Sequence, residues 1–177
     1  MPRFIQDIKG YGQGSTIKLI VNFIFNPNYH AVLIYRIAHF FNKIKLPIIS
    51  KILMYINRIF YSVDIDCRAD LAGGFVLVHG IGTVIGAFVQ TLGPVRVYQG
   101  VTIGENNNRE RIINNKVVVQ PILNEGTVLY ANSGVFGPII MGKNVVIGAG
   151  TKVTSDVEDN TIIYCKHEYN KKVITNK

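Results

Sequence analysis

Apolar residues, with one threonine among them, recur at every sixth position from residue 65 to residue 153. They fall into three runs, and their positions are Ile65, Leu71 and Leu77; Ile85, Thr91, Val97 and Ile103; and Leu123, Leu129, Val135, Met141, Ile147 and Val153. A second series lies four residues after the first, at Val89, Val95 and Val101 and again at Thr127, Ser133, Ile139, Val145 and Thr151. A helix repeats every 3.6 residues and a strand every two, so neither alone selects every sixth residue. A period of six is typical of a parallel β-helix, in which each step makes one short strand and one corner.

The period breaks at two places. The first break separates Leu77 from Ile85 by eight residues instead of six, and it contains His79. The second break is a stretch of twenty residues that contains the largely polar segment 105–120. That segment cannot continue the wall of the solenoid, so we expect an extruded loop. Interruptions in a regular solenoid are where functional groups tend to lie, and His79 is therefore the first candidate for chemistry.

The first 62 residues have a different pattern. Apolar and aromatic residues follow helical spacing over 29–41 and again over 48–61, with proline-containing breaks before each segment. We expect two or three amphipathic helices that form a small cap. The predicted organisation is a helical region at 1–62, a β-helix at 63–165 and a C-terminal tail at 166–177. We favour packing of the cap on the neighbouring domain over a role at a membrane surface.

Composition narrows the classes of function. The formal net charge is +8 and the pI is about 9.5, which favours anionic partners. No long Lys/Arg run indicates nucleic-acid binding. The two cysteines, Cys67 and Cys165, have no metal-type or disulfide spacing, so we expect no metal. We expect no secretory signal and no membrane span, because no apolar run reaches about 18 residues. The expected location is the cytoplasm.

The motifs from residue 63 onward resemble a known family. The matching pieces are Val63–Ile65, Val78–Gly80, Val84–Gly86, Gln99–Gly104 and Ile147–Val153. They resemble the serine acetyltransferase group of left-handed β-helix acyltransferases, and look closest to its short members associated with exopolysaccharide and capsule biosynthesis. The resemblance implies a mainly β fold, a left-handed parallel β-helix of hexapeptide repeats with a small helical cap. It also implies acetyl-CoA as acetyl donor and a homotrimer with active sites between neighbouring prisms.

The chemistry of acetyl transfer gives roles to particular residues. A hydroxyl acceptor needs a base, and a neutral imidazole, with a pKa near 6.5, suits that role. His79 is the candidate base, and Asp64, fifteen residues earlier as in the family, would orient it. The resemblance implies that coenzyme A lies against small residues at corners of the prism. The matching positions are Gly104, Ala131, Ala149 and Gly150, although tight corners alone would also require small residues.

Two positions of the predicted acceptor site depart from the family pattern. Val78 stands where serine acetyltransferases have an aspartate, and Gln120 stands where they have a second histidine. Because a zwitterionic amino acid needs charged partners, these changes favour a glycan hydroxyl. The predicted function is therefore O-acetylation of a sugar of a surface polysaccharide, such as capsule, O-antigen or exopolysaccharide. The basic cap would suit work at the inner face of the membrane, on a small or lipid-linked acceptor.

Two alternatives stay open. The first is a serine O-acetyltransferase of cysteine biosynthesis, which turnover of serine would distinguish. The second is a β-helix without activity that acts as a scaffold, which replacement of His79 by alanine would test.

Overall fold

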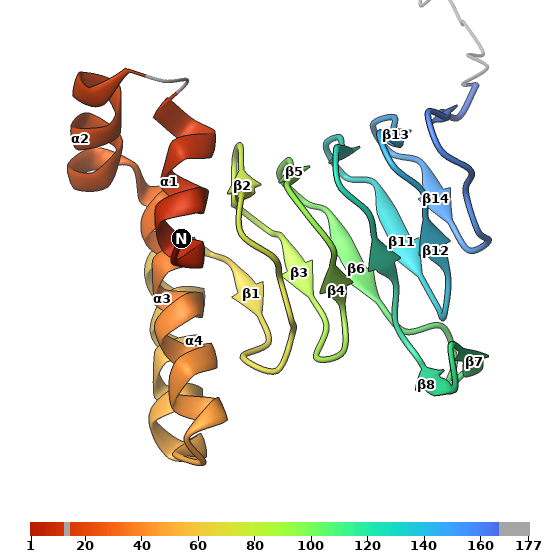
Figure 1. Cartoon of the computed structure of the whole chain (residues 1–177), viewed down its shortest axis with the longest axis horizontal. Helices are drawn as coiled ribbons and strands as arrows, with labels where there is room; N and C mark the ends of the chain where they lie inside the picture. The colour runs from red at the N-terminus through yellow and green to blue at the C-terminus, as the bar shows by residue number, and fades with distance from the viewer. Residues whose placement is uncertain (13–14, 167–177) are drawn as a thin grey trace, which may run out of the picture.

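Four helices form the first part of the chain in the structure, a computed structural model that describes residues 1–12 and 15–166. They are α1 (Arg3–Gly12), α2 (Thr16–Phe25), α3 (Pro27–Lys43) and α4 (Pro47–Tyr61), and they stand together at one end of the molecule (Figure 1). The sequence predicted two or three helices, so that number is wrong. None of the described helices is long and apolar enough to cross a membrane. Most of the predicted tail, from residue 167 onward, lies outside the described residues.

The rest of the described chain winds into a left-handed parallel β-helix with three faces. The first face stacks β1 (Asp64–Ile65), β3 (Val84–Ile85), β6 (Thr102–Gly104), β11 (Gly134–Phe136) and β14 (Lys152–Val153). The second stacks β2 (Phe75–Leu77), β5 (Val95–Val97), β10 (Thr127–Leu129), β13 (Val146–Ile147) and β15 (Ile162–Ile163). The third stacks β4 (Gln90–Thr91), β9 (Ile122–Leu123) and β12 (Ile140–Met141). The predicted fold class is thereby confirmed.

The six-residue period corresponds to the filling of the prism. Every residue of the first predicted series, from Ile65 to Val153, is buried, and so is every residue of the second series. Equivalent residues stack in register from coil to coil, as Ile85 does on Ile103 and Ile103 on Val135. Each inward side chain therefore contacts its counterparts above and below, which explains why one apolar residue per step suffices to form a continuous core.

Both breaks in the period leave the regular coil. The corner between β2 and β3 is two residues longer than the corner between β5 and β6 that stacks on it. At the second break, β9 lies one step after β6, so the twenty-residue interval contains fourteen residues more than the six of a regular step. The excess forms an antiparallel hairpin of β7 (Arg111–Ile113) and β8 (Lys116–Val118) that projects from the prism (Figure 1).

The helical cap forms hydrogen bonds with backbone groups at the open end of the first coil. The buried carboxylate of Asp7, in α1, accepts hydrogen bonds from the backbone N–H groups of Gly74 and Phe75 at 2.9 and 3.0 Å. The same carboxylate pairs with Arg36 of α3 at 2.9 Å, and that guanidinium also donates to the carbonyl oxygen of Ala72. Unpaired edge groups are a liability in any sheet, and here the cap pairs them.

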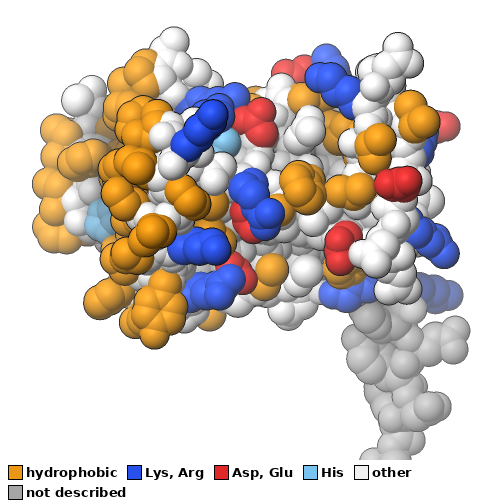
Figure 2. Space-filling view, turned by 90° about the horizontal axis from the view of Figure 1, so that it is seen from below, with side chains coloured by type: hydrophobic (Ala, Val, Ile, Leu, Met, Phe, Trp, Pro, Cys, Tyr) orange, Lys and Arg blue, Asp and Glu red, His pale blue; other side chains and the backbone are white. Residues whose placement is uncertain are grey.

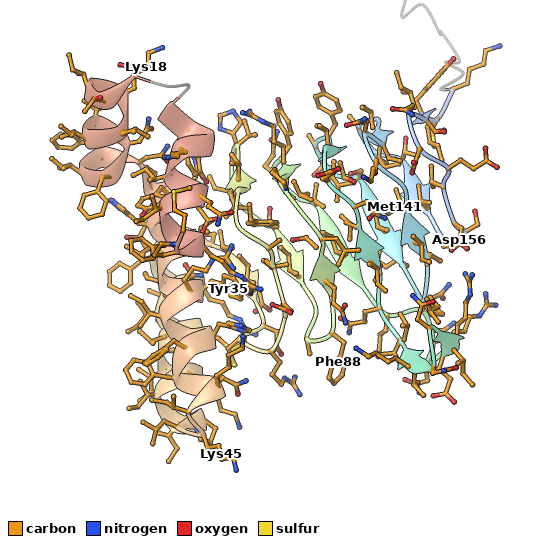
Figure 3. All side chains as sticks on the ribbon, viewed as in Figure 1. Lys18, Tyr35, Lys45, Phe88, Met141 and Asp156 are labelled. Carbon is orange, nitrogen blue, oxygen red and sulfur yellow. The ribbon has the colours of Figure 1, made fainter. Side chains whose placement is uncertain are left out.

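Two tyrosines continue this contact. Tyr35 lies between α3 and the first coil (Figure 3), where its hydroxyl donates to the carbonyl oxygen of Ala69 at 2.7 Å. The hydroxyl of Tyr11 accepts from the backbone N–H of Leu77 at 2.9 Å. Burial raises the pKa of both phenols, that of Tyr35 to about 12. Both groups are therefore neutral at physiological pH.

Candidate active site

His79 projects from the lengthened corner between β2 and β3 and is exposed in the single chain. It borders a cavity of about 340 Å³ between the cap and the first coil. The cavity is lined by Pro27, Asn28, Ala31, Phe60, Tyr61, Ser62, Val63, His79, Gly80 and Ile81. An imidazole at the mouth of a cavity is placed to exchange a proton with a molecule inside it.

Asn28 fixes the backbone on both sides of His79. Its side-chain Nδ2 donates to the carbonyl oxygen of Val78 at 3.1 Å, and its Oδ1 accepts from the N–H of Gly80 at 2.7 Å. Asn28 itself stands in the first turn of α3, where Asn26 caps the helix. The sequence pattern marked this segment only as a break between helices, so the contribution of Asn28 was missed.

Aromatic rings continue from His79 along the same edge of the prism. The ring of Tyr98, one coil further, lies 6.4 Å from the imidazole between centroids and is set edge-on to it. Tyr130, on the next coil, lies 4.8 Å from Tyr98. Stacked aromatic rings at these separations are mutually favourable, and they form a partly apolar wall beside the predicted base.

Asp64 does not contact the predicted base within the described part of the chain. It stands in β1, opposite Val84, and its carboxylate lies 2.8 Å from the guanidinium of Arg58 at the end of α4. No hydrogen bond or ion pair among the described residues joins it to His79, and it does not line the cavity. Its orienting role therefore stays a prediction.

Three of the four predicted cofactor positions share an edge of the prism with His79. The corners of this edge take the left-handed conformation at Gly82, Gly100, Asn132 and Gly150, with φ of 73, 67, 59 and 71°. Ala131 and Ala149 directly precede the last two of these residues. A Cβ added at Gly150 would meet no atom within 4 Å, so the surface is open there. Gly104 ends β6 at the opposite edge of the first face, with equally open space.

Of the two predicted acceptor-binding positions, Val78 begins the lengthened corner after β2, and Gln120 lies between β8 and β9. Val78 is half-buried, and its N–H bonds to the carbonyl oxygen of Val97 at 2.8 Å. Gln120 is buried, and its Oε1 accepts from the N–H of Phe88 at 2.9 Å. Its side chain also packs on Gly86, where a Cβ would clash with it. Neither residue lines the cavity beside His79. Their role in acceptor binding stays a prediction.

Known proteins resemble the chain in sequence and in fold. The serine acetyltransferase of Bacillus pumilus is 34% identical over 134 residues, which cover 76% of this chain and 59% of that enzyme. The serine acetyltransferase of Helicobacter pylori is 33% identical over 131 residues, covering 74% of this chain and 73% of the relative. No protein-family model matches the chain.

Solved structures of serine acetyltransferases share the fold of this chain. Serine acetyltransferase 1 of Entamoeba histolytica, in complex with L-cysteine, superposes with a TM-score of 0.79 at 28% identity, covering 92% of this chain and 62% of that one. The three-sided coil of six-residue steps defines a hexapeptide-repeat protein. The chain belongs to the serine acetyltransferase family. It spans about three fifths of the length of the Bacillus pumilus relative, at 59%.

The family corrects one prediction. Val78 and Gln120 favoured a polysaccharide acceptor, but the relatives are serine acetyltransferases and none of those compared is a polysaccharide O-acetyltransferase. The prediction of a glycan acceptor is therefore wrong. The error came from letting two single positions, Val78 and Gln120, decide the acceptor against the similarity of most of the chain to serine acetyltransferases.

Proposed function

We propose that the chain is a serine O-acetyltransferase that uses acetyl-CoA as donor and His79 as base. Membership of the serine acetyltransferase family supports the reaction. The observation that carries the role of His79 is its position at the mouth of the cavity, on a corner lengthened by two residues and held by Asn28.

The reaction needs one proton carrier. The serine hydroxyl gives its proton to the imidazole as its oxygen attacks the thioester carbonyl. The tetrahedral species then breaks its carbon–sulfur bond, and the imidazolium returns the proton to the departing thiolate. The products are O-acetylserine and coenzyme A. A neutral imidazole is required at the start, because only the neutral ring can accept the proton.

The acyl donor and the neighbouring protomers complete the site in this proposal. Coenzyme A lies along the prism edge past Ala131, Ala149 and Gly150, with Gly104 facing it from an adjacent subunit of a homotrimer. No Asp, Glu, Lys or Arg lines the cavity within the described residues. Because serine carries both charges, we infer that its charged groups bind to the adjacent protomer.

Release of free thiol from acetyl-CoA tests the proposal directly. We expect serine-dependent release by the purified chain, and a loss of roughly a hundredfold or more in His79→Ala. Binding of coenzyme A, measured by calorimetry, should be the same in both proteins. Absence of serine-dependent release would overturn the proposed acceptor, and a wild-type rate in His79→Ala would overturn the proposed base.

A further inference from the structure

Helix α4 is packed with its polar side inward. The buried side chains are Ser50, which donates to the carbonyl oxygen of Ala38 at 2.9 Å, and Asn57, which donates to that of Ala31 at 3.2 Å. The outward side carries apolar residues at positions four, three and four apart, all 53–75% exposed: Ile48, Ile52, Tyr55 and Ile59. An amphipathic helix normally buries its apolar stripe. In α4 that stripe is left on the surface.

Helix α2 repeats the feature. It has no buried residue at all, and its apolar side chains Ile17, Ile20, Val21 and Ile24 follow helical spacing at 50–75% exposure. Figure 3 shows side chains of these helices extending away from the strands, and Figure 2 shows hydrophobic side chains gathered over the helical end. We call the exposed apolar residues of α2 and α4 together the outer helical surface. Exposed apolar side chains gathered at one end of a molecule mark an interaction site.

The charges around this surface have a single sign. The first 62 residues contain eight Lys and Arg residues but only one acidic residue, Asp7. Asp7 is fully buried against Arg36, so the helical region exposes no carboxylate. Exposed lysines lie on α2, on α4 and at the turn between α3 and α4, and they are Lys18, Lys45 and Lys51.

We propose that the outer helical surface rests on an anionic phospholipid bilayer, with α2 and α4 lying in the interface rather than crossing it. Apolar side chains flanked by lysines are the combination that such a surface binds. A second copy of the same surface would bring lysine against lysine, whereas phosphate headgroups are complementary to them. This inference goes beyond the proposed function, since acetyl transfer to serine requires no membrane.

Vesicle flotation with the full chain tests the inference. We expect the protein to float with phosphatidylcholine–phosphatidylglycerol vesicles and much less with phosphatidylcholine alone, and high salt should release it. The combined variant Ile52→Ser, Tyr55→Ser and Ile59→Ser should bind at least roughly tenfold more weakly. A matched control removes equally exposed apolar residues elsewhere: Leu92→Ser, Ile112→Ser and Val117→Ser. The control should bind as the wild type does.

Charge is tested separately. Lys18→Gln, Lys45→Gln and Lys51→Gln together should weaken binding to the anionic vesicles and leave the serine-dependent rate in lipid-free buffer unchanged. Equal flotation of the apolar variant and the wild type would overturn the inference, as would a wild type that stays soluble with both vesicles. Sedimentation without lipid identifies the competing occupant. An assembly that becomes smaller only in the apolar variant would show that a second copy covers the surface.

Discussion

Asn28 reaches the corner of His79 from another part of the chain. It holds the carbonyl of Val78 and the N–H of Gly80 with one side chain. Two anchored peptide groups leave the intervening residue little freedom, and small displacements of a reacting group reduce rates strongly. Asn28 is therefore a positioning residue for the proposed base.

Replacing Asn28 by alanine should lower kcat by roughly tenfold to a hundredfold, with little change in the KM for acetyl-CoA. Asn28→Asp keeps the acceptor for Gly80 and should recover part of the rate. Steady-state kinetics of the two variants measure kcat and the KM for acetyl-CoA. The control is Asn26→Ala, which removes the cap of α3 at a cost of about 1 kcal/mol and should keep kcat. Equal losses of kcat in Asn26→Ala and Asn28→Ala would mean that Asn28 acts only through stability.

Asp64 gives a second prediction for single residues. If its carboxylate turns from Arg58 to orient the imidazole during the reaction, Asp64→Asn should lower kcat by about two to four orders of magnitude. Asp70→Asn, on the same coil and in an exposed ion pair with Arg3, is the matched control and should be neutral. Rate measurements across pH compare them. An Asp64→Asn enzyme as fast as the Asp70→Asn control would leave Asp64 as a partner of Arg58 only.

The sequence located His79 because an exact period of six makes two extra residues visible. It did not separate Gly104 from Ala131, Ala149 and Gly150, which lie on another edge of the prism. It could not find Asn28, because that contact joins residues 52 positions apart across two kinds of structure. Nor could it tell that Gln120 bonds within the wall, because spacing does not give the direction of a side chain outside the repeat.

Among the elements, α1 depends most on its neighbours. Gly10 and Gly12 lower the intrinsic helix propensity of this segment, and their size is required by packing. A Cβ at Gly10 would lie 2.4 Å from the side chain of Val76, and one at Gly12 would overlap Leu19. Tertiary contact thus stabilises a helix that local pattern indicated only weakly, which explains the underestimate of the number of helices.

The ion pair between α1 and α3 should determine how firmly the cap is held. Asp7→Ala would leave the nearly buried Arg36 charge unpaired and expose two amides of the first coil, and we expect a loss of about 3–5 kcal/mol in the free energy of unfolding. Denaturant titration measures it. Arg3→Ala breaks an exposed pair with Asp70 and should cost no more than about 1 kcal/mol. Similar losses of unfolding free energy in both variants would show that the buried pair stabilises the protein no more than the exposed pair does.

For the whole molecule, the period predicts a deletion that the fold should accept. Removing residues 106–119 joins Glu105 to Gln120 and brings Leu123 to six positions after Ile103. Pro121, which is buried, then stands two positions before the inward residue, as Val89 does before Thr91. The hairpin is lost but the coil becomes regular.

We expect this deletion to change the melting temperature by no more than about 5 °C, because a shorter connection costs little entropy. Leu123→Ala in the intact chain, which removes a fully buried side chain from the same step, should cost about 2–5 kcal/mol. Circular dichroism on heating compares the two proteins. A large fall in the melting temperature of the deletion variant would mean that the hairpin contributes to the stability of the prism.

The six-residue period was sufficient to predict the coil, its core and its two interruptions. Each of these follows from short-range spacing that repeats along the chain. The period carried no information on the outer helical surface. What covers Ile48 and Ile52 depends on a partner outside the chain, and the helical spacing of these residues is the same whether the stripe faces a core or a lipid.

The contacts of Asp7, Tyr11 and Tyr35 with the first coil also affect the order of biosynthesis. These acceptors and donors belong to segments that leave the ribosome before any strand does. The first strands therefore emerge beside a surface already able to receive them, and each finished turn becomes the template for the next. Winding in the direction of translation shortens the time for which a growing solenoid presents a bare end to other nascent chains.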